Sequence, residues 1–155
     1  MKVALPLLGG CLCGQVRYEL RGQPFMVYVC HCKDCQRQSG SAFGMSMPAP
    51  RSAFSITAGE PAAFERTMPS GRRSVVRFCA VCATRVFAES SVRVVTIRPG
   101  TLDETSWLRP AAQNFMRSAQ SWSCIDDIPG FDTQPEAFEE IGRLWRQQGI
   151  TFVRS

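Results

Sequence analysis

The chain has 155 residues, of which 45% are hydrophobic and 20% charged, so it is neither disordered nor of low complexity. This length fits one domain over residues 1–155, and no apolar run approaches the roughly 20 residues that cross a bilayer. The apolar opening segment is too short for a secretory signal, so we expect a cytoplasmic protein. The formal net charge of +5 makes nucleic-acid binding one function to consider.

Short β-rich segments, separated by Gly, Pro and Ser, fill the chain up to residue 98. Alternating or β-branched patterns predict strands at Gln15–Leu20, Phe25–Val29, Ala42–Met47, Ala53–Thr57, Ala62–Met68, Ser74–Phe78, Arg85–Ala88 and Val92–Arg98. A helix of one or two turns is predicted at Asp34–Ser39, ended by Gly40. The stretch from Thr101 to Thr133 is expected to be rich in loops.

The C-terminal region has the pattern of an amphipathic helix over about residues 135–148. Thr133 to Glu136 have the spacing of a capping box, and Gly149 supplies a stop signal. An apolar stripe is expected to close over a sheet; its members are Phe138, Ile141, Leu144 and Trp145. The fold class is therefore mainly β, with packed short antiparallel sheets and a C-terminal helix.

Closely spaced cysteines are the most informative feature of the sequence. Because thiols stay reduced inside cells, we expect them to bind metal. Residues two apart in an extended segment face the same side, and a two-residue gap lets a tight turn bring two thiolates to one ion. Seven cysteines follow these spacings: Cys11, Cys13, Cys30, Cys32, Cys35, Cys79 and Cys82.

These seven cysteines divide into a group of four and a group of three, which predicts two zinc ions per chain. Three cysteines, Cys30, Cys32 and Cys35, are too close in sequence to be shared between sites. Three ligands leave a fourth position for water or substrate, so this group is predicted to be catalytic, as the ligands of a reactive zinc. All-sulfur ligation favours zinc, although iron or cadmium could occupy the same thiolates. The closed, structural zinc site is assigned to Cys11, Cys13, Cys79 and Cys82.

Other interpretations remain for some of these residues. Each two-residue gap is also that of a thioredoxin-like redox pair, although no βαβ pattern surrounds it. Cys124 stands alone and is expected to be a buried small residue outside both sites. His31 lies between two predicted ligands and is expected to face away from the metal, in a packing or hydrogen-bonding role.

Three blocks of the sequence resemble the glutathione-dependent formaldehyde-activating enzymes, a family that shares a domain with centromere protein V. The blocks run over residues 10–18, 30–43 and 77–82, and weaker similarity extends the region to about residues 8–131. The resemblance implies a β-tent-like fold around two zinc sites, with the same division of ligands. It also implies that glutathione adds to formaldehyde at the three-cysteine zinc, giving S-hydroxymethylglutathione.

Two positions depart from the family pattern. Ala83 stands where Gly usually follows the third block, which predicts a modestly different turn without loss of a ligand. Gln113 precedes Asn114 and Phe115 where many members have a His before an aromatic residue. If that His handles substrate or protons, its replacement by Gln113 bears on whether the glutathione reaction persists.

The predicted function is that of a zinc-dependent carbon–sulfur lyase or synthase. It would add a small-molecule thiol such as glutathione to a small carbonyl compound such as formaldehyde. Arginine forks suit carboxylates, so four arginines are candidates to bind the thiol: Arg37, Arg72, Arg73 and Arg77.

Two alternatives belong to other functional classes. The first is a non-catalytic zinc module that binds protein or nucleic acid, and the second is a thiol redox or metal-buffering protein. Seven thiolates and two divalent ions together lower the formal net charge by three, and the sequence has no Lys/Arg run. We therefore expect neither nucleic-acid nor membrane partners.

Overall fold

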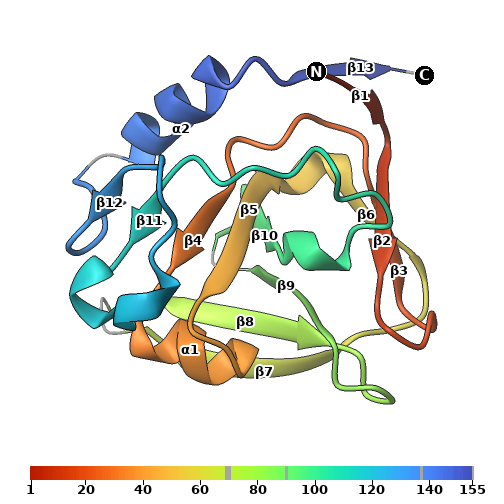
Figure 1. The fold of residues 1–155 in the computed structure, drawn as a ribbon. Helices are drawn as coiled ribbons and strands as arrows, with labels where there is room; N and C mark the ends of the chain where they lie inside the picture. The colour runs from red at the N-terminus through yellow and green to blue at the C-terminus, as the bar shows by residue number, and fades with distance from the viewer. Residues whose placement is uncertain (69–70, 90, 137, 155) are drawn as a thin grey trace.

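The computed structural model describes residues 1–68, 71–89, 91–136 and 138–154. Its largest described sheet has eight strands in the order β12-β11-β4-β5-β10-β9-β8-β7 (Figure 1). These strands are β4 (Tyr28–Cys30), β5 (Gly44–Pro50), β7 (Ala62–Thr67), β8 (Arg73–Phe78), β9 (Arg85–Glu89), β10 (Val94–Ile97), β11 (Gln113–Asn114) and β12 (Gly130–Phe131).

Two smaller sheets complete the described strands. An antiparallel sheet has the order β2-β3-β6 and contains β2 (Leu7–Gly10), β3 (Arg17–Leu20) and β6 (Phe54–Ala58). A parallel pair joins β1 (Lys2–Leu5) to β13 (Thr151–Arg154), so the two ends of the chain lie side by side (Figure 1). The mainly β class with a C-terminal helix is confirmed, although β11 pairs in parallel with both β4 and β12.

The hydrophobic core lies between the three-stranded and the eight-stranded sheet. Tyr18 and Phe54 contact each other with ring centroids 5.3 Å apart, and Phe54 lies 4.7 Å from Phe87 of β9. In β5 and β10, fully buried Met47 and Val95 belong to this core. Because side chains alternate along a strand, the even-numbered residues of β5 and β10 lie on the opposite face of the large sheet.

The helix α2 (Phe138–Gln147) packs against the core through the stripe expected from the sequence. Ile141 and Trp145 are fully buried, and the Trp145 ring meets that of Trp107 edge-on at 6.4 Å. The described helix begins at Phe138, so Thr133 to Glu136 precede it and do not form its first turn, while Ala137 lies outside the described residues. Among the residues described, no helix is long and apolar enough to cross a membrane.

Candidate metal centres and substrate cavity

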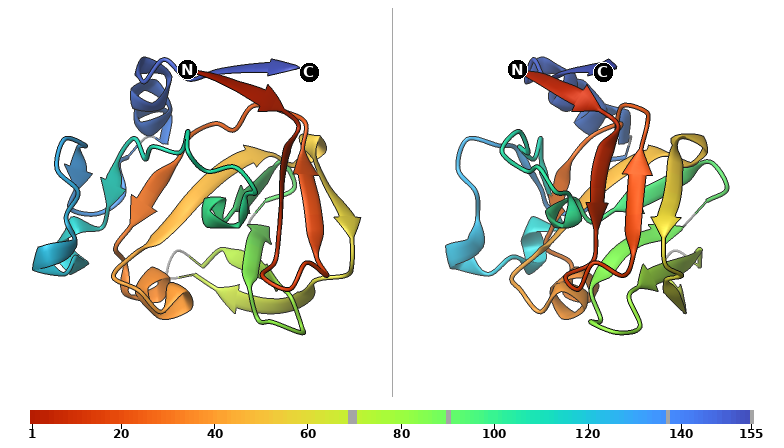
Figure 2. Two further views of the ribbon diagram at one scale, coloured as in Figure 1. Left: turned by 45° about the vertical axis from the view of Figure 1, so that its right-hand side comes forward. Right: turned by 90° about the vertical axis from the view of Figure 1, so that its right-hand side faces the viewer.

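Four cysteine sulfurs meet where two strand connections lie side by side. Cys11 and Cys13 belong to the β2–β3 connection, and Cys79 and Cys82 to the β8–β9 connection (Figure 2). All four sulfurs lie within 4.8 Å of one another, with Cys13 Sγ 3.5 Å from Cys11 Sγ and 3.7 Å from Cys79 Sγ. Tetrahedral zinc with Zn–S bonds of ~2.3 Å separates its sulfurs by ~3.8 Å, so the donor set and spacing fit a closed zinc site.

The hydroxyl of Thr84 links the two connections. It accepts a hydrogen bond from the Leu12 backbone N–H at 3.1 Å and lies 3.2 Å from Cys82 Sγ. Hydrogen bonds donated by the hydroxyl and the backbone N–H of Thr84 lower the pKa of the Cys82 thiol to about 5. This thiol is therefore prepared to ligate a metal as the thiolate.

The turn after Cys82 keeps the left-handed backbone that glycine adopts most readily. Ala83 has a φ of 60°, and its N–H donates to the Cys79 carbonyl at 2.9 Å. The turn therefore needs no glycine here, and the expectation that Ala83 modestly changes it stays a prediction. The alanine adopts the conformation at the steric cost of its Cβ.

The second cluster forms at the junction of β4 and the helix α1 (Lys33–Ser39). Cys30 ends β4, Cys32 caps the helix, and Cys35 lies in its first turn, with the three sulfurs within 4.8 Å of one another. The Cys35 N–H donates to Cys32 Sγ at 3.3 Å. Hydrogen bonds from the Cys30 and Cys35 thiols, together with such backbone donors, lower the pKa of Cys32. Three sulfurs in this arrangement fit a metal site with one position left for another ligand.

The three-cysteine cluster lies in the wall of a cavity of about 720 Å³ with a strongly cationic lining. Among the described residues that line it, Asp34 is the only acidic one, and this carboxylate pairs with Arg66. Six basic side chains line the same cavity: Lys33, Arg66, Arg72, Arg85, Arg98 and Arg117. A cavity with this excess of positive charge attracts an anionic ligand.

A register shift in the β8–β9 ladder places Arg85 in this cavity. Phe78 pairs with Arg85, whereas the preceding Arg77 pairs with Phe87, so one residue of β9 has no partner opposite. Without this shift Arg85 would share the core face with Phe87, because residues two apart lie on the same side of a strand. The shift therefore turns the Arg85 guanidinium to the cavity face.

Arg98 follows β10 and is the second partly buried cation in this wall. Its guanidinium donates to the Met45 carbonyl and to Ser46 Oγ, both at 2.9 Å. Neither Arg85 Nε nor Arg98 Nε has a hydrogen-bond partner among the described residues. Burial, together with the charge of Arg98, lowers the pKa of Arg85 to about 9. An anion bound beside the two guanidinium groups would offset the cost of burying their charge.

Of the four arginines considered from the sequence, only Arg72 lines the cavity. Arg37 is exposed on α1 outside it, Arg73 pairs with Glu65, and Arg77 donates to Glu89 at 2.9 Å. The sequence signals available for the cavity arginines were weak, because a bulge places Arg85 and the sheet pairing of β10 places Arg98.

His31 is fully buried and packs edge-on against Phe43, with ring centroids 5.4 Å apart. Its Nε2 lies 3.3 Å from Gln113 Oε1. It belongs to neither cysteine cluster. The expected packing and hydrogen-bonding role matches these contacts.

The residues after Gln113 contribute to the cavity, whereas Gln113 itself does not line it. Asn114 is 1% exposed, and its Oδ1 has no hydrogen-bond partner among the described residues. Phe115 lines the same wall with a left-handed φ of 61°. A bulky residue in this conformation is strained, and such strain is often found at functional sites. Cys124 lies outside both clusters as expected, but it is exposed rather than buried.

Comparison with known proteins places the chain in a family. The model of the glutathione-dependent formaldehyde-activating enzymes matches residues 6–118, and the chain belongs to this family. The fold is similar to that of a Rhodobacter sphaeroides protein solved by crystallography in a structural genomics programme. That match has a TM-score of 0.52 and 16% identity, and it covers 81% of this chain and 100% of the other. No curated protein matches the sequence.

Proposed function

We propose that this protein is a cytoplasmic, zinc-dependent carbon–sulfur lyase or synthase. Its substrates would be a carboxylate-bearing thiol such as glutathione and a carbonyl compound such as formaldehyde. The main support is the position of Cys30, Cys32 and Cys35, whose clustered sulfurs lie in the wall of a cationic cavity. Membership of a family named for glutathione and formaldehyde supports the same reaction class.

The reaction needs no oxidant or reductant. The thiol sulfur forms a bond to the carbonyl carbon, the C=O double bond becomes a C–O single bond, and the thiol proton ends on that oxygen. The reverse reaction breaks the carbon–sulfur bond and restores both reactants. Zinc held by the three cysteines would supply positive charge that stabilises a thiolate or polarises a carbonyl oxygen.

The protein's own residues would bind and orient the thiol substrate. Arg85 and Arg98 line the cavity, where their guanidinium groups would pair with a carboxylate, and a charge-assisted hydrogen bond to each is stronger than a neutral one. Asn114 lies in the same wall and would help to shape the place where the substrate binds. These contacts would fix the orientation of the substrate and bring its sulfur to the cysteine cluster.

A Cys32→Ser variant tests this proposal. We expect the wild type to hold two zinc ions and to accelerate the exchange between glutathione plus formaldehyde and their adduct, measured by NMR. The variant should lose one zinc ion and at least ~100-fold of the turnover. Cys124→Ser is the matched control, because Cys124 lies outside both clusters, and it should retain both ions and full activity.

Two results would contradict the proposal. Full activity in Cys32→Ser would show that the three-cysteine cluster is not the reactive centre. A wild type that holds two zinc ions but turns over no thiol and carbonyl pair would instead support the non-catalytic zinc module.

A further inference from the structure

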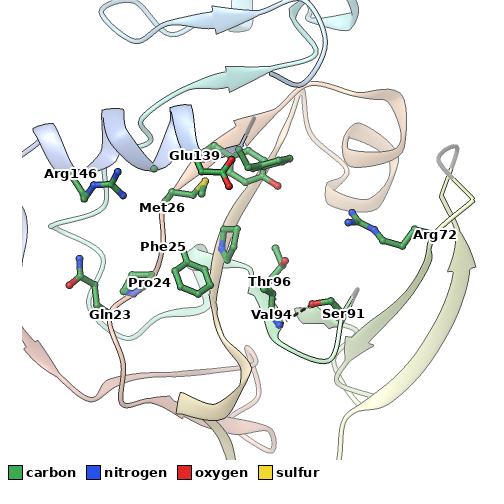
Figure 3. A pocket seen from close by; sticks show the side chains of 14 residues that line it. Gln23, Pro24, Phe25, Met26, Arg72, Ser91, Val94, Thr96, Glu139 and Arg146 are labelled. Carbon is green, nitrogen blue, oxygen red and sulfur yellow. Dashed lines mark hydrogen bonds between the residues drawn. The ribbon is translucent and has the colours of Figure 1, made fainter. Parts of the chain in front are cut away.

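A second cavity of about 720 Å³ lies beside the cationic one, between α2 and the large sheet. Figure 3 shows Phe25 and Met26, which precede β4, on one side of it, Val94 and Thr96 of β10 along its wall, and Arg72 across from them. Apolar groups supply much of the lining: Pro24, Phe25, Met26, Pro48, Val94 and Phe138. Its volume is typical of sites that enclose a small molecule.

The two cavities lie next to each other along one face of the large sheet, and together they are called the trough below. Four residues line both: Tyr28, Arg72, Thr96 and Phe138. Strand pairing explains this arrangement, because Tyr28 of β4 lies opposite Ser46 of β5, and Thr96 of β10 lies opposite Pro48. Ser46 lines the cationic cavity and Pro48 the apolar one, so neighbouring even-numbered positions of β5 connect the two.

Small side chains keep this face of the sheet hollow. Thr96 also lies opposite Ala88 of β9, and both line the cationic cavity. Thr96, Ala88 and Ser46 all have small side chains, so they leave open space that larger residues would occupy. The trough therefore has a cationic end that contains three thiols and an apolar end under α2.

We propose that the substrate carries an aliphatic arm of several carbon atoms, which lies in the cavity between α2 and β10. This inference rests on the proposed function, since it places the carboxylates at Arg85 and Arg98 and the sulfur at the cysteine cluster. The arm belongs to the carbonyl compound and hence to the carbon–sulfur adduct. A one-carbon carbonyl such as formaldehyde leaves the apolar end unfilled, whereas a longer aliphatic aldehyde displaces water from it.

The residues that line the two ends of the trough indicate a ligand with an anionic part and an apolar part. Charge complementarity favours an anion at the end with six cations, and apolar contacts with Phe25 and Met26 favour hydrocarbon at the other. A free alkane lacks the anionic part, and glutathione alone lacks the apolar part. An S-alkyl adduct of a carboxylate-bearing thiol has both.

Two unreactive thioethers test the apolar arm by direct binding. S-hexylglutathione and S-methylglutathione share one head group and differ by five methylenes. Each buried methylene raises the affinity by up to ~4-fold, so even partial burial of the hexyl chain should make S-hexylglutathione bind at least ~10-fold more tightly than S-methylglutathione. Calorimetry on the zinc-loaded protein measures both affinities. Equal affinities would overturn the inference and leave the proposed function standing.

Matched substitutions locate the arm. Val94→Phe fills the apolar cavity, and it should abolish the advantage of S-hexylglutathione while leaving S-methylglutathione binding unchanged. Val92→Phe is the control, because Val92 is 91% exposed and does not line the cavity, and it should keep the full advantage. Phe25→Ala removes an apolar wall and should weaken only the hexyl compound. An advantage that survives Val94→Phe would contradict this location.

If neither thioether binds, glutathione is the wrong head group. A probe without a head group then tests whether the apolar cavity binds hydrocarbon. Hexan-1-ol should shift the NMR signals of Phe25 and Val94 in the wild type, and it should leave the Phe25 signals unshifted in Val94→Phe. Such shifts would support the apolar site while the glutathione assignment fails. Their absence would overturn the inference as well.

Discussion

The Gln113 side chain and the Ile125 backbone exchange two hydrogen bonds. Gln113 Oε1 accepts from the Ile125 N–H, and Gln113 Nε2 donates to the Ile125 carbonyl, each at 2.8 Å. Gln113 is only 3% exposed and comes from β11, whereas Ile125 lies in the irregular segment that follows. This pair therefore holds that segment against β11, the strand next to the edge of the large sheet.

We expect Gln113→Ala to act on stability rather than on chemistry. The substitution leaves the N–H and carbonyl of Ile125 without their partner, which should lower the free energy of unfolding by about 2–3 kcal/mol. Urea denaturation measures this loss, and limited proteolysis should cut the segment after β11 faster. The specific activity of folded protein should stay within about twofold. A large loss of activity at unchanged stability would instead assign Gln113 to the reaction.

Ala83→Gly should stabilise the protein. The left-handed φ of 60° at Ala83 costs a residue with a Cβ about 1 kcal/mol or more, whereas glycine adopts it freely. Glycine also gains entropy in the unfolded chain, so the net increase should be about 0.5–1 kcal/mol in thermal or urea unfolding. Ala80→Gly in the same connection is the control and should not stabilise, because Ala80 has no positive φ.

The two cysteine clusters should differ in their contribution to stability. The larger cluster joins residues 11 and 82, and a cross-link that closes so long a loop restricts the unfolded chain strongly. Cys82→Ser should therefore lower the unfolding free energy by ~3 kcal/mol or more. Cys32→Ser removes a ligand from a cluster within six residues and should cost much less. Comparable losses in the two variants would show that both sites hold the fold together.

Much of the sheet structure could be predicted from local patterns. The strands near Gly44–Pro50, Phe54–Ala58 and Ala62–Thr67 and the apolar stripe of α2 are visible because burial repeats with the period of the element. The parallel pair of Lys2–Leu5 with Thr151–Arg154 could not be predicted, because each partner is short and lies at the other end of the chain. The two-residue strands β11 and β12 carry no periodicity at all.

The cysteine groupings could be proposed from spacing, since residues two or three apart necessarily lie close together. The cationic cavity could not, because its arginines come from two separate strands, β7 and β9, and from three segments outside the strands. Arg85 illustrates the reason: an alternating pattern places it on the core face, and only the register shift opposite Phe78 turns it to the cavity.

Arg85→Gln should weaken binding of a carboxylate-bearing thiol. Removal of one charge-assisted contact should raise KM for glutathione about tenfold with little change in kcat, because the contact orients the substrate and does not touch the reacting atoms. Arg37→Gln is the control, since Arg37 is exposed and outside the cavity. Steady-state kinetics at two ionic strengths should show a KM that rises with salt in the wild type and less so in Arg85→Gln. A pure kcat effect would contradict this role.

Stability should decline at alkaline pH through two tyrosines, the buried Tyr18 and the partly buried Tyr28. Burial raises the pKa of Tyr18 above its ordinary value and that of Tyr28 to about 12. A phenol in the unfolded chain ionises near pH ~10, so the contribution of these groups is fully present below that pH and is lost as pH rises through the folded-state pKa. Urea unfolding at pH 8, 10 and 11 measures the decline.

Tyr18→Phe provides the control for this titration. The variant should lose about 1 kcal/mol at pH 8, because the 2.9 Å hydrogen bond to Thr101 is removed. Between pH 10 and 11 its stability should fall less steeply than that of the wild type. An identical slope in the two proteins would show that Tyr18 does not contribute to alkaline unfolding.

The different sequence spans of the two clusters also affect how the protein is made. A ribosome delivers the chain from its N-terminus, so residues 30–35 leave it together, whereas the cluster begun at Cys11 waits for Cys82. If both clusters bind zinc as proposed, a nascent chain would complete its three-cysteine cluster while the first half of the other cluster still lacks its partners. In a cell short of zinc, the three-cysteine cluster would then have the earlier access to the metal, and the four-cysteine cluster would form last.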